Sequence, residues 1–116
     1  MYYVNMSNNN SQIDARDVYK KIESGELQNS VLLDVRTPGE HARERIKGSI
    51  NIPVDEIESK VEEILPDKDK TIYVYCMSGS RSAMGAQILK SLGYKNVYDI
   101  MNGIMACRVY GLPLEK

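Results

Sequence analysis

Several residue types and patterns are rare in this sequence. It has no Trp, no Phe, one His and two Cys, and its formal net charge is −1. Apolar runs such as residues 31–33 span only a few positions. About 20 apolar residues are needed to cross a bilayer, so we expect no membrane-spanning segment. Without a basic excess the chain has no general means of binding nucleic acid. The N-terminus lacks the basic and apolar regions of a signal peptide, which favours a cytoplasmic location.

The two cysteines, Cys76 and Cys107, lie far apart in the chain and form no Cys-x-x-Cys pair of the kind that binds zinc or exchanges disulfides. In a reducing compartment both should be free thiols. The Met residues near Cys76 in the sequence are explained by gap filling in a core without Phe or Trp. We therefore assign neither a metal nor a cofactor to this chain.

Strand-like and helix-like segments alternate along the 116 residues, of which 42% are hydrophobic and 27% charged. Length and composition predict a single domain, residues 1–116. The alternation is typical of an α/β fold, and we expect a five-stranded, mainly parallel sheet with helices on both faces. The predicted strands are residues 31–35, 49–52, 71–75 and 96–100, with residues 2–4 as a fifth strand at an edge.

Apolar residues at helical spacing predict the helices between these strands. Asp14 can cap the first helix, which Gly25 ends. The second runs from Val54 to Pro66 and leaves acidic residues on its outer face. The remaining helices are predicted at residues 82–92, 40–45 and 103–110.

The residues that indicate a chemical function lie in the stretch from residue 73 to residue 83. A strand with buried character ends directly on Cys76, and a helix is predicted to begin near Ser82. In an open α/β sheet, sites lie at the carboxyl ends of the strands. Gly79 allows a turn that a larger residue would resist, so the backbone N–H groups of this loop can surround one point as an anion nest. The loop is therefore expected to place hydrogen-bond donors around Cys76.

Charge also favours a reactive Cys76. The N-terminal end of the following helix and the cation Arg81 belong to the same region, and both stabilise a thiolate at neutral pH. A cation at a helix start is unfavourable by itself, which indicates that an anion lies nearby. A thiolate in such a cradle is a nucleophile that can carry a group between substrates. The alternative is that Cys76 is a small buried hydrophobe, but its spacing to Gly79 and Arg81 favours function.

Four motifs, in order along the chain, resemble the rhodanese (sulfurtransferase) family. They are Leu33-Asp34-Val35-Arg36 followed by Glu40, the segment from Ile46 to Pro53, the loop from Cys76 to Arg81, and Asn102-Gly103-Ile104-Met105-Ala106. The similarity runs from about residue 13 to residue 113. No single motif is decisive, but four in this order are specific.

The resemblance implies that Cys76 carries sulfur and cycles between a thiolate and a persulfide. Thiosulfate or another sulfane-sulfur donor would load it, and cyanide, a thiol or a protein would accept the sulfur. The loop's N–H groups would stabilise the anionic persulfide, and Arg81 would attract the donor. Asp34 and Arg36 would shape the neighbouring loop, with Arg36 paired to Glu40. The loop residues expected to bind substrate are Met77, Ser78, Gly79, Ser80, Arg81 and Ser82.

Two positions depart from the family pattern. His41 stands where an aromatic residue is usual, and we expect it at the surface or packed in a loop, because a preformed thiolate needs no general base. Cys107 stands where the family commonly has Trp, and a small core residue is expected there. The alternative is a resolving thiol for Cys76, which requires the two Cα atoms to lie within about 7 Å.

Two other functions compete with sulfur transfer. Phosphatases and arsenate reductases use a similar fold with a cysteine–arginine loop, but the phosphatase loop is one residue longer than the stretch between Cys76 and Arg81, and the shorter loop suits a sulfur atom better than a phosphate. Rhodanese-like domains without a working cysteine serve as binding or regulatory modules. The presence of both Cys76 and Arg81 argues against that role.

Overall fold

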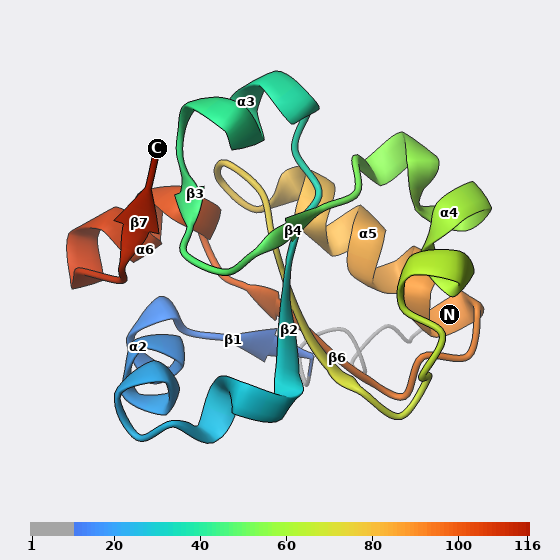
Figure 1. Ribbon diagram of the computed structural model, residues 1–116, viewed down its shortest axis with the longest axis horizontal. Coiled ribbons are helices and arrows are strands. Elements are labelled where there is room, and N and C mark those ends of the chain that lie inside the picture. The colour runs from blue at the N-terminus through green and yellow to red at the C-terminus, as the bar shows by residue number, and fades with distance from the viewer. Residues whose placement is uncertain (1–10) are drawn as a thin grey trace, which may run out of the picture.

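A five-stranded parallel sheet forms the centre of the part that the computed structural model describes, residues 11–116 (Figure 1). The strand order is β1-β6-β5-β2-β4, and each of these pairings is parallel. The strands are β1 (Gln12–Ile13), β2 (Ser30–Asp34), β4 (Ile50–Asn51), β5 (Thr71–Tyr75) and β6 (Asn96–Ile100). A second sheet pairs β3 (Arg45–Ile46) with β7 (Leu114–Glu115) in antiparallel fashion.

The predicted α/β fold is confirmed, and β2, β4, β5 and β6 lie where the sequence placed strands. The fifth strand is β1, which pairs with β6 at one edge of the sheet. This strand was not predicted, because two residues are too few to show the alternation of a strand. The expected edge strand at residues 2–4 lies outside the described residues.

The helices alternate with the strands along the chain. They are α2 (Ala15–Glu23), α3 (Pro38–Arg43), α4 (Ile57–Ile64), α5 (Ser80–Ser91) and α6 (Gly103–Tyr110), with 3₁₀ turns η1 (Glu26–Asn29) and η2 (Val54–Glu56). Asp14 caps α2 as predicted, its carboxylate accepting from the backbone N–H of Arg16 at 2.8 Å. From residue 11 onward, no helix has the length and apolar character needed to span a membrane.

Two helices begin earlier than the sequence indicates. The helix predicted from residue 40 begins at Pro38, because Thr37 and Glu40 form a capping box and Pro38 suits a first turn. The helix predicted from residue 82 begins at Ser80, because Gly79 with φ 124° occupies its N-cap position. The loop after Cys76 is therefore shorter than predicted, and Arg81 lies in the first helical turn.

Side chains of the sheet alternate between two hydrophobic clusters. On β5, Ile72 and Val74 contribute to a cluster on the α4 and α5 side, whereas Tyr73 and Tyr75 contribute to one on the α2 and α6 side. Figure 1 shows these helix pairs on opposite sides of the sheet. This arrangement confirms helices on both faces, and both faces of the central strands are covered, as parallel sheets require.

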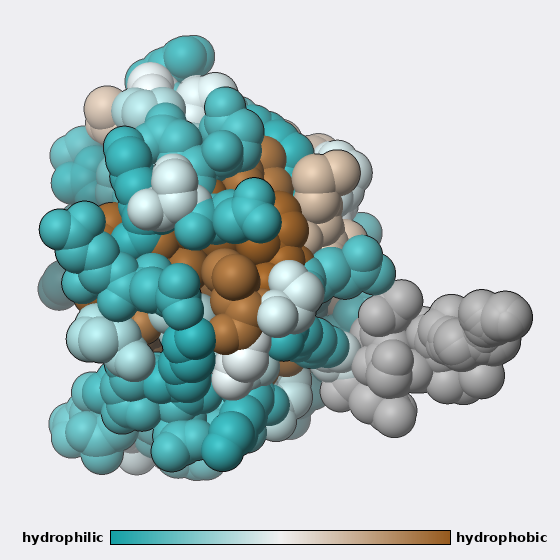
Figure 2. Space-filling model, turned by 90° about the vertical axis from the view of Figure 1, so that its right-hand side faces the viewer, coloured by the Kyte–Doolittle hydropathy of each residue, from teal (hydrophilic) through white to brown (hydrophobic). Residues whose placement is uncertain are grey.

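Hydrophobic surface is still visible on the side of α4 and α5, where Figure 2 shows apolar side chains framed by hydrophilic ones. Val54, Leu65 and Leu92 pack against the cluster on this side and are only partly buried. Ile64 at the end of α4 is 47% exposed. The core on this side is thus not completely enclosed.

Candidate active site

The Cys76 side chain lies directly after the central strand β5, at its carboxyl end. The residue is 1% exposed and belongs to the cluster on the α4 and α5 side. The backbone N–H of Gly79 donates to Sγ of Cys76 at 3.0 Å. Gly79 has φ 124°, a left-handed conformation that strains any residue with a Cβ. The glycine therefore allows the loop to turn its N–H back toward the sulfur.

The turn at Asn102 and Gly103 packs against the Cys76 loop. The backbone N–H of Ile104 donates to the carbonyl oxygen of Cys76 at 2.9 Å. A Cβ on Gly103 would lie 2.3 Å from that oxygen, so only glycine fits. Asn102 precedes it at φ 61°, a conformation that Asn tolerates better than most residues. The Asn102-Gly103 motif is thus explained by its close packing on the Cys76 loop.

Ser82, in the first turn of α5, connects the sulfur to a buried carboxylate. Its Oγ lies 3.4 Å from Sγ of Cys76, 3.1 Å from the carbonyl oxygen of Gly79 and 2.5 Å from Oδ1 of Asp99. Burial raises the pKa of Asp99, while the hydrogen bond from Ser82 and the charge of Lys90 oppose that shift. Asp99 is not among the site residues predicted from the sequence. The available signal was a charged residue near the end of a strand whose other residues are uncharged.

Arg81 and Glu40 form an ion pair beside the loop. The two guanidinium Nη atoms donate to the two carboxylate oxygens at 2.7 and 3.1 Å. The hydrogen bonds from Arg81 lower the pKa of Glu40 to about 2, against the opposing effect of burial. The anion expected near Arg81 is therefore supplied by the chain itself. The predicted pairing of Arg36 with Glu40 is wrong, because Arg81 occupies that carboxylate.

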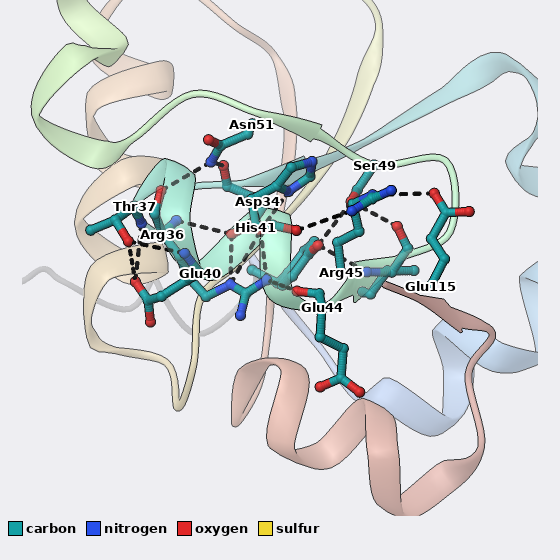
Figure 3. A network of polar contacts seen from close by, with 12 residues as sticks. Asp34, Arg36, Thr37, Glu40, His41, Glu44, Arg45, Ser49, Asn51 and Glu115 are labelled. Carbon is teal, nitrogen blue, oxygen red and sulfur yellow. Dashed lines mark hydrogen bonds and ion pairs between the residues drawn. The ribbon is translucent and has the colours of Figure 1, made fainter.

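Arg36 instead pairs with Asp34, at the centre of the network in Figure 3. Both side chains are buried, and the Arg36 guanidinium donates to both carboxylate oxygens through Nε and Nη2. His41 Nδ1 lies 2.8 Å from the same carboxylate. The amide of Asn51 donates to the backbone carbonyls of Asp34 and Arg36 at 2.9 Å each. Asp34 thus organises the segment after β2, and His41 packs in this loop rather than at the free surface.

The other loop residues differ in their exposure. Ser78 and Ser80 are exposed, whereas Met77 is half-buried. Met77 lines a pocket of about 390 Å³. The other residues of this pocket are Arg36, Glu40, Arg43, Glu44, Arg108 and Lys116. Cationic side chains therefore predominate around an opening beside the Cys76 loop.

Cys107 is a buried thiol on the other side of the sheet. It belongs to the cluster of α2 and α6, whereas Cys76 belongs to that of α4 and α5. Burial raises the pKa of Cys107 to about 12, which keeps its thiol protonated. The predicted small core residue is confirmed by this packing.

These features define an α/β domain that holds a buried thiol at the carboxyl end of a central parallel strand, under the N-terminus of a helix. The model of the family described as rhodanese-like domain matches residues 14–108. The chain belongs to this family.

Similar proteins include named sulfurtransferases. Thiosulfate sulfurtransferase PspE of Escherichia coli is 38% identical over 65 residues, which cover 56% of this chain and 62% of that protein. A sulfurtransferase of Allochromatium vinosum is 31% identical over 104 residues, covering 90% of this chain and 94% of that protein. The solution structure of a rhodanese-like domain from Anabaena superposes with a TM-score of 0.85 at 27% identity, covering 90% of this chain and 78% of that one. The family and these relatives support sulfur transfer as the general activity.

Proposed function

We propose that this protein is a thiosulfate sulfurtransferase in which Cys76 carries sulfane sulfur as a persulfide. Thiosulfate or a similar donor supplies the sulfur, and cyanide, a thiol or a protein accepts it. The observation that carries the proposal is the contact between the Gly79 N–H and Sγ of Cys76 at 3.0 Å. An N–H aimed at sulfur stabilises the negative charge of a thiolate and of the sulfur atom attached to it.

In the loading step, the Cys76 thiolate attacks the outer sulfur of thiosulfate. A new S–S bond forms, the S–S bond of thiosulfate breaks, and sulfite leaves with its electron pair. In the unloading step, the acceptor attacks the terminal sulfur and the Cys76 thiolate leaves. Each half-reaction has one substrate, so ping-pong kinetics are expected.

Arg81 attracts the anionic donor in this proposal. Its charge is shared with Glu40, so the donor competes with that carboxylate for the guanidinium. The cationic pocket lined by Met77, Arg43 and Arg108 gives the donor a route toward the loop. The positive charge of the pocket therefore attracts the donor, and the donor then replaces Glu40 as the partner of Arg81.

The two rival functions fit less well. The phosphatase loop is one residue longer than the stretch between Cys76 and Arg81, and the shorter loop suits a sulfur atom better than a phosphate. A binding module has no use for a cysteine held by a loop N–H, yet Gly79 directs its N–H to Cys76. Aryl phosphate hydrolysis that Cys76→Ser removes would instead favour the phosphatase.

The test is an intact-mass spectrum of the reduced protein before and after thiosulfate, and again after cyanide. A gain of one sulfur atom that cyanide removes is expected in the wild type and in Cys107→Ala, but not in Cys76→Ser. Cys107→Ala is the matched control because it removes the other thiol of the chain. No gain in the wild type, or a gain that persists in Cys76→Ser, would refute the proposal.

A further inference from the structure

A buried carboxylate is linked to the sulfur of Cys76 by a single hydroxyl group. Ser82 Oγ lies 3.4 Å from Sγ and 2.5 Å from Oδ1 of Asp99. Cys76 is 1% exposed, Ser82 0% and Asp99 5%. The three residues come from the end of β5, from α5 and from β6. Loading of Cys76 as proposed above requires its thiol to lose a proton, and the side chain has little direct contact with water.

Counting hydrogens limits how the three groups can be bonded. Ser82 has one hydroxyl hydrogen, and the 2.5 Å separation of Oγ from Oδ1 of Asp99 needs one hydrogen between the two oxygens. If Asp99 is ionised, Ser82 donates to it and accepts from the Cys76 thiol. If Asp99 is protonated, it donates to Ser82, whose own hydrogen can then bond the Cys76 thiolate at 3.4 Å or the carbonyl oxygen of Gly79 at 3.1 Å. The geometry accommodates both arrangements.

We propose that Asp99 takes up the proton of Cys76 through Ser82 when the thiolate forms. The S–H proton passes to Ser82 Oγ while the Ser82 hydroxyl proton passes to Oδ1, so two O–H bonds form and one S–H and one O–H bond break. The network carries one negative charge before and after the step. Asp99 is a positioning residue here, because it acts through Ser82 and does not touch the reacting sulfur.

Conservation of charge is the physical advantage of this exchange. Burying a second unpaired charge would be unfavourable, but here the charge only moves from the carboxylate to the sulfur. At the sulfur it is stabilised by the Gly79 N–H at 3.0 Å and by the N-terminus of α5. The pKa of Asp99, raised by burial, makes this carboxylate a better proton acceptor than an exposed one.

The charged groups around the network are few. Lys90 of α5 interacts with Asp99, and burial lowers the pKa of Lys90. Arg81 of α5 lies close enough to Cys76 for an electrostatic interaction, and Glu40 of α3 forms an ion pair with Arg81. Asp99 also lines an open pocket of about 300 Å³ with Gln12, Ser78 and Asn102. That pocket gives the carboxylate a route by which the proton can later reach solvent.

The first experiment measures the rate at which iodoacetamide alkylates Cys76 across a range of pH, with the labelled residue identified by peptide mapping. Two groups that share a proton titrate in two steps. We expect a two-step profile with a plateau for the wild type, and the loss of the lower step in Asp99→Asn. Asp69→Asn is the matched control, because Asp69 pairs with Lys95 at the surface, and it should keep both steps. A single step in the wild type, or an unchanged profile in Asp99→Asn, would overturn the proposal.

The second experiment follows the proton itself by infrared difference spectroscopy. Adding thiosulfate to the wild type should produce the carbonyl band of a protonated carboxylic acid, and the band should be missing in Asp99→Asn. The proposal rests on the proposed function, but the two fail differently. Absence of sulfur gain in the mass spectrum refutes sulfur transfer, whereas sulfur gain without the infrared band refutes the role of Asp99. The alkylation profile needs no sulfur transfer at all.

Discussion

Arg81 and Glu40 join the first turn of α5 to α3 through two hydrogen bonds of 2.7 and 3.1 Å. The Cys76 loop leads directly into α5, and α3 follows the segment that Asp34 organises. The pair therefore fixes two neighbouring loops relative to each other. It also places a negative charge of the protein where the anionic donor of the proposed function would otherwise meet a free guanidinium.

Removing the carboxylate should weaken the fold in a pH-dependent way. Arg81 lowers the pKa of Glu40 to about 2, from its ordinary value of 4.5. Glu40 therefore contributes stability above about pH 4.5, and the contribution disappears as the pH falls through about 2. Because the pair is partly exposed, we expect Glu40→Gln to lower the free energy of unfolding by about 0.5–1 kcal/mol at pH 7. Urea unfolding at pH 7, 4 and 2.5 checks this, and a difference that stays constant with pH would contradict it.

The same pair predicts opposite effects on donor binding. Arg81→Ala removes the cation and should raise KM for thiosulfate, with a smaller effect on kcat. Glu40→Gln releases Arg81 from its competitor and should lower KM. Steady-state kinetics with varied thiosulfate measure both. Arg43 lines the same pocket as Glu40 but lies outside the ion pair, so Arg43→Ala serves as the comparison for a general charge effect. If both variants raised KM, the pair would be a structural unit rather than a competition for the donor.

The buried pair of Arg36 and Asp34 should be far more important for stability. Arg36→Met leaves the Asp34 carboxylate buried without its cation, and breaking such a pair costs about 3–5 kcal/mol. Arg45→Met is the matched control, since Arg45 pairs with Glu115 where both side chains are partly exposed, and it should cost about 1 kcal/mol or less. Chemical denaturation of the two variants makes the comparison. Equal losses would show that Asp34 finds other partners.

Gly103 should tolerate no side chain. A Cβ there would lie 2.3 Å from the carbonyl oxygen of Cys76, so Gly103→Ala must displace the loop that holds the sulfur. Gly111→Ala is the control, because its φ is also positive but nothing lies within 4 Å of its added Cβ. We expect the control to lose about 1–2 kcal/mol from backbone strain. Gly103→Ala should lose clearly more, as measured by thermal unfolding, and equal losses would contradict the close packing.

The sequence was sufficient for the fold because its signals are local. The continuous apolar run of β2 and the β-branched and aromatic residues of β5 predict central strands, and Asp14 caps α2 where expected. It was also sufficient to place Gly79 beside Cys76, since one short loop contains both, whereas Arg81 lies in the first turn of α5 and pairs with Glu40. The short strand β1 had too few residues to show a pattern.

Contacts between segments that are distant in the sequence could not be predicted. Either Arg36 or Arg81 could form an ion pair with Glu40, and only the positions of α3 and α5 in the fold show that Arg81 does so. Asp99 comes near Ser82 because β6 lies next to β5 in the sheet. No local sequence pattern shows that β6 lies beside β5, so the link between the Asp99 carboxylate and the Cys76 sulfur is seen only in the folded structure.

The pairing of β7 with β3 has a practical consequence for attaching other molecules to this domain. It carries Lys116 to the wall of the cationic pocket that Met77 also lines. A peptide, tag or fusion partner joined after Lys116 would leave the domain at the opening beside the Cys76 loop. Such a graft could deliver a tethered sulfur acceptor at high local concentration, or obstruct the opening if it is bulky.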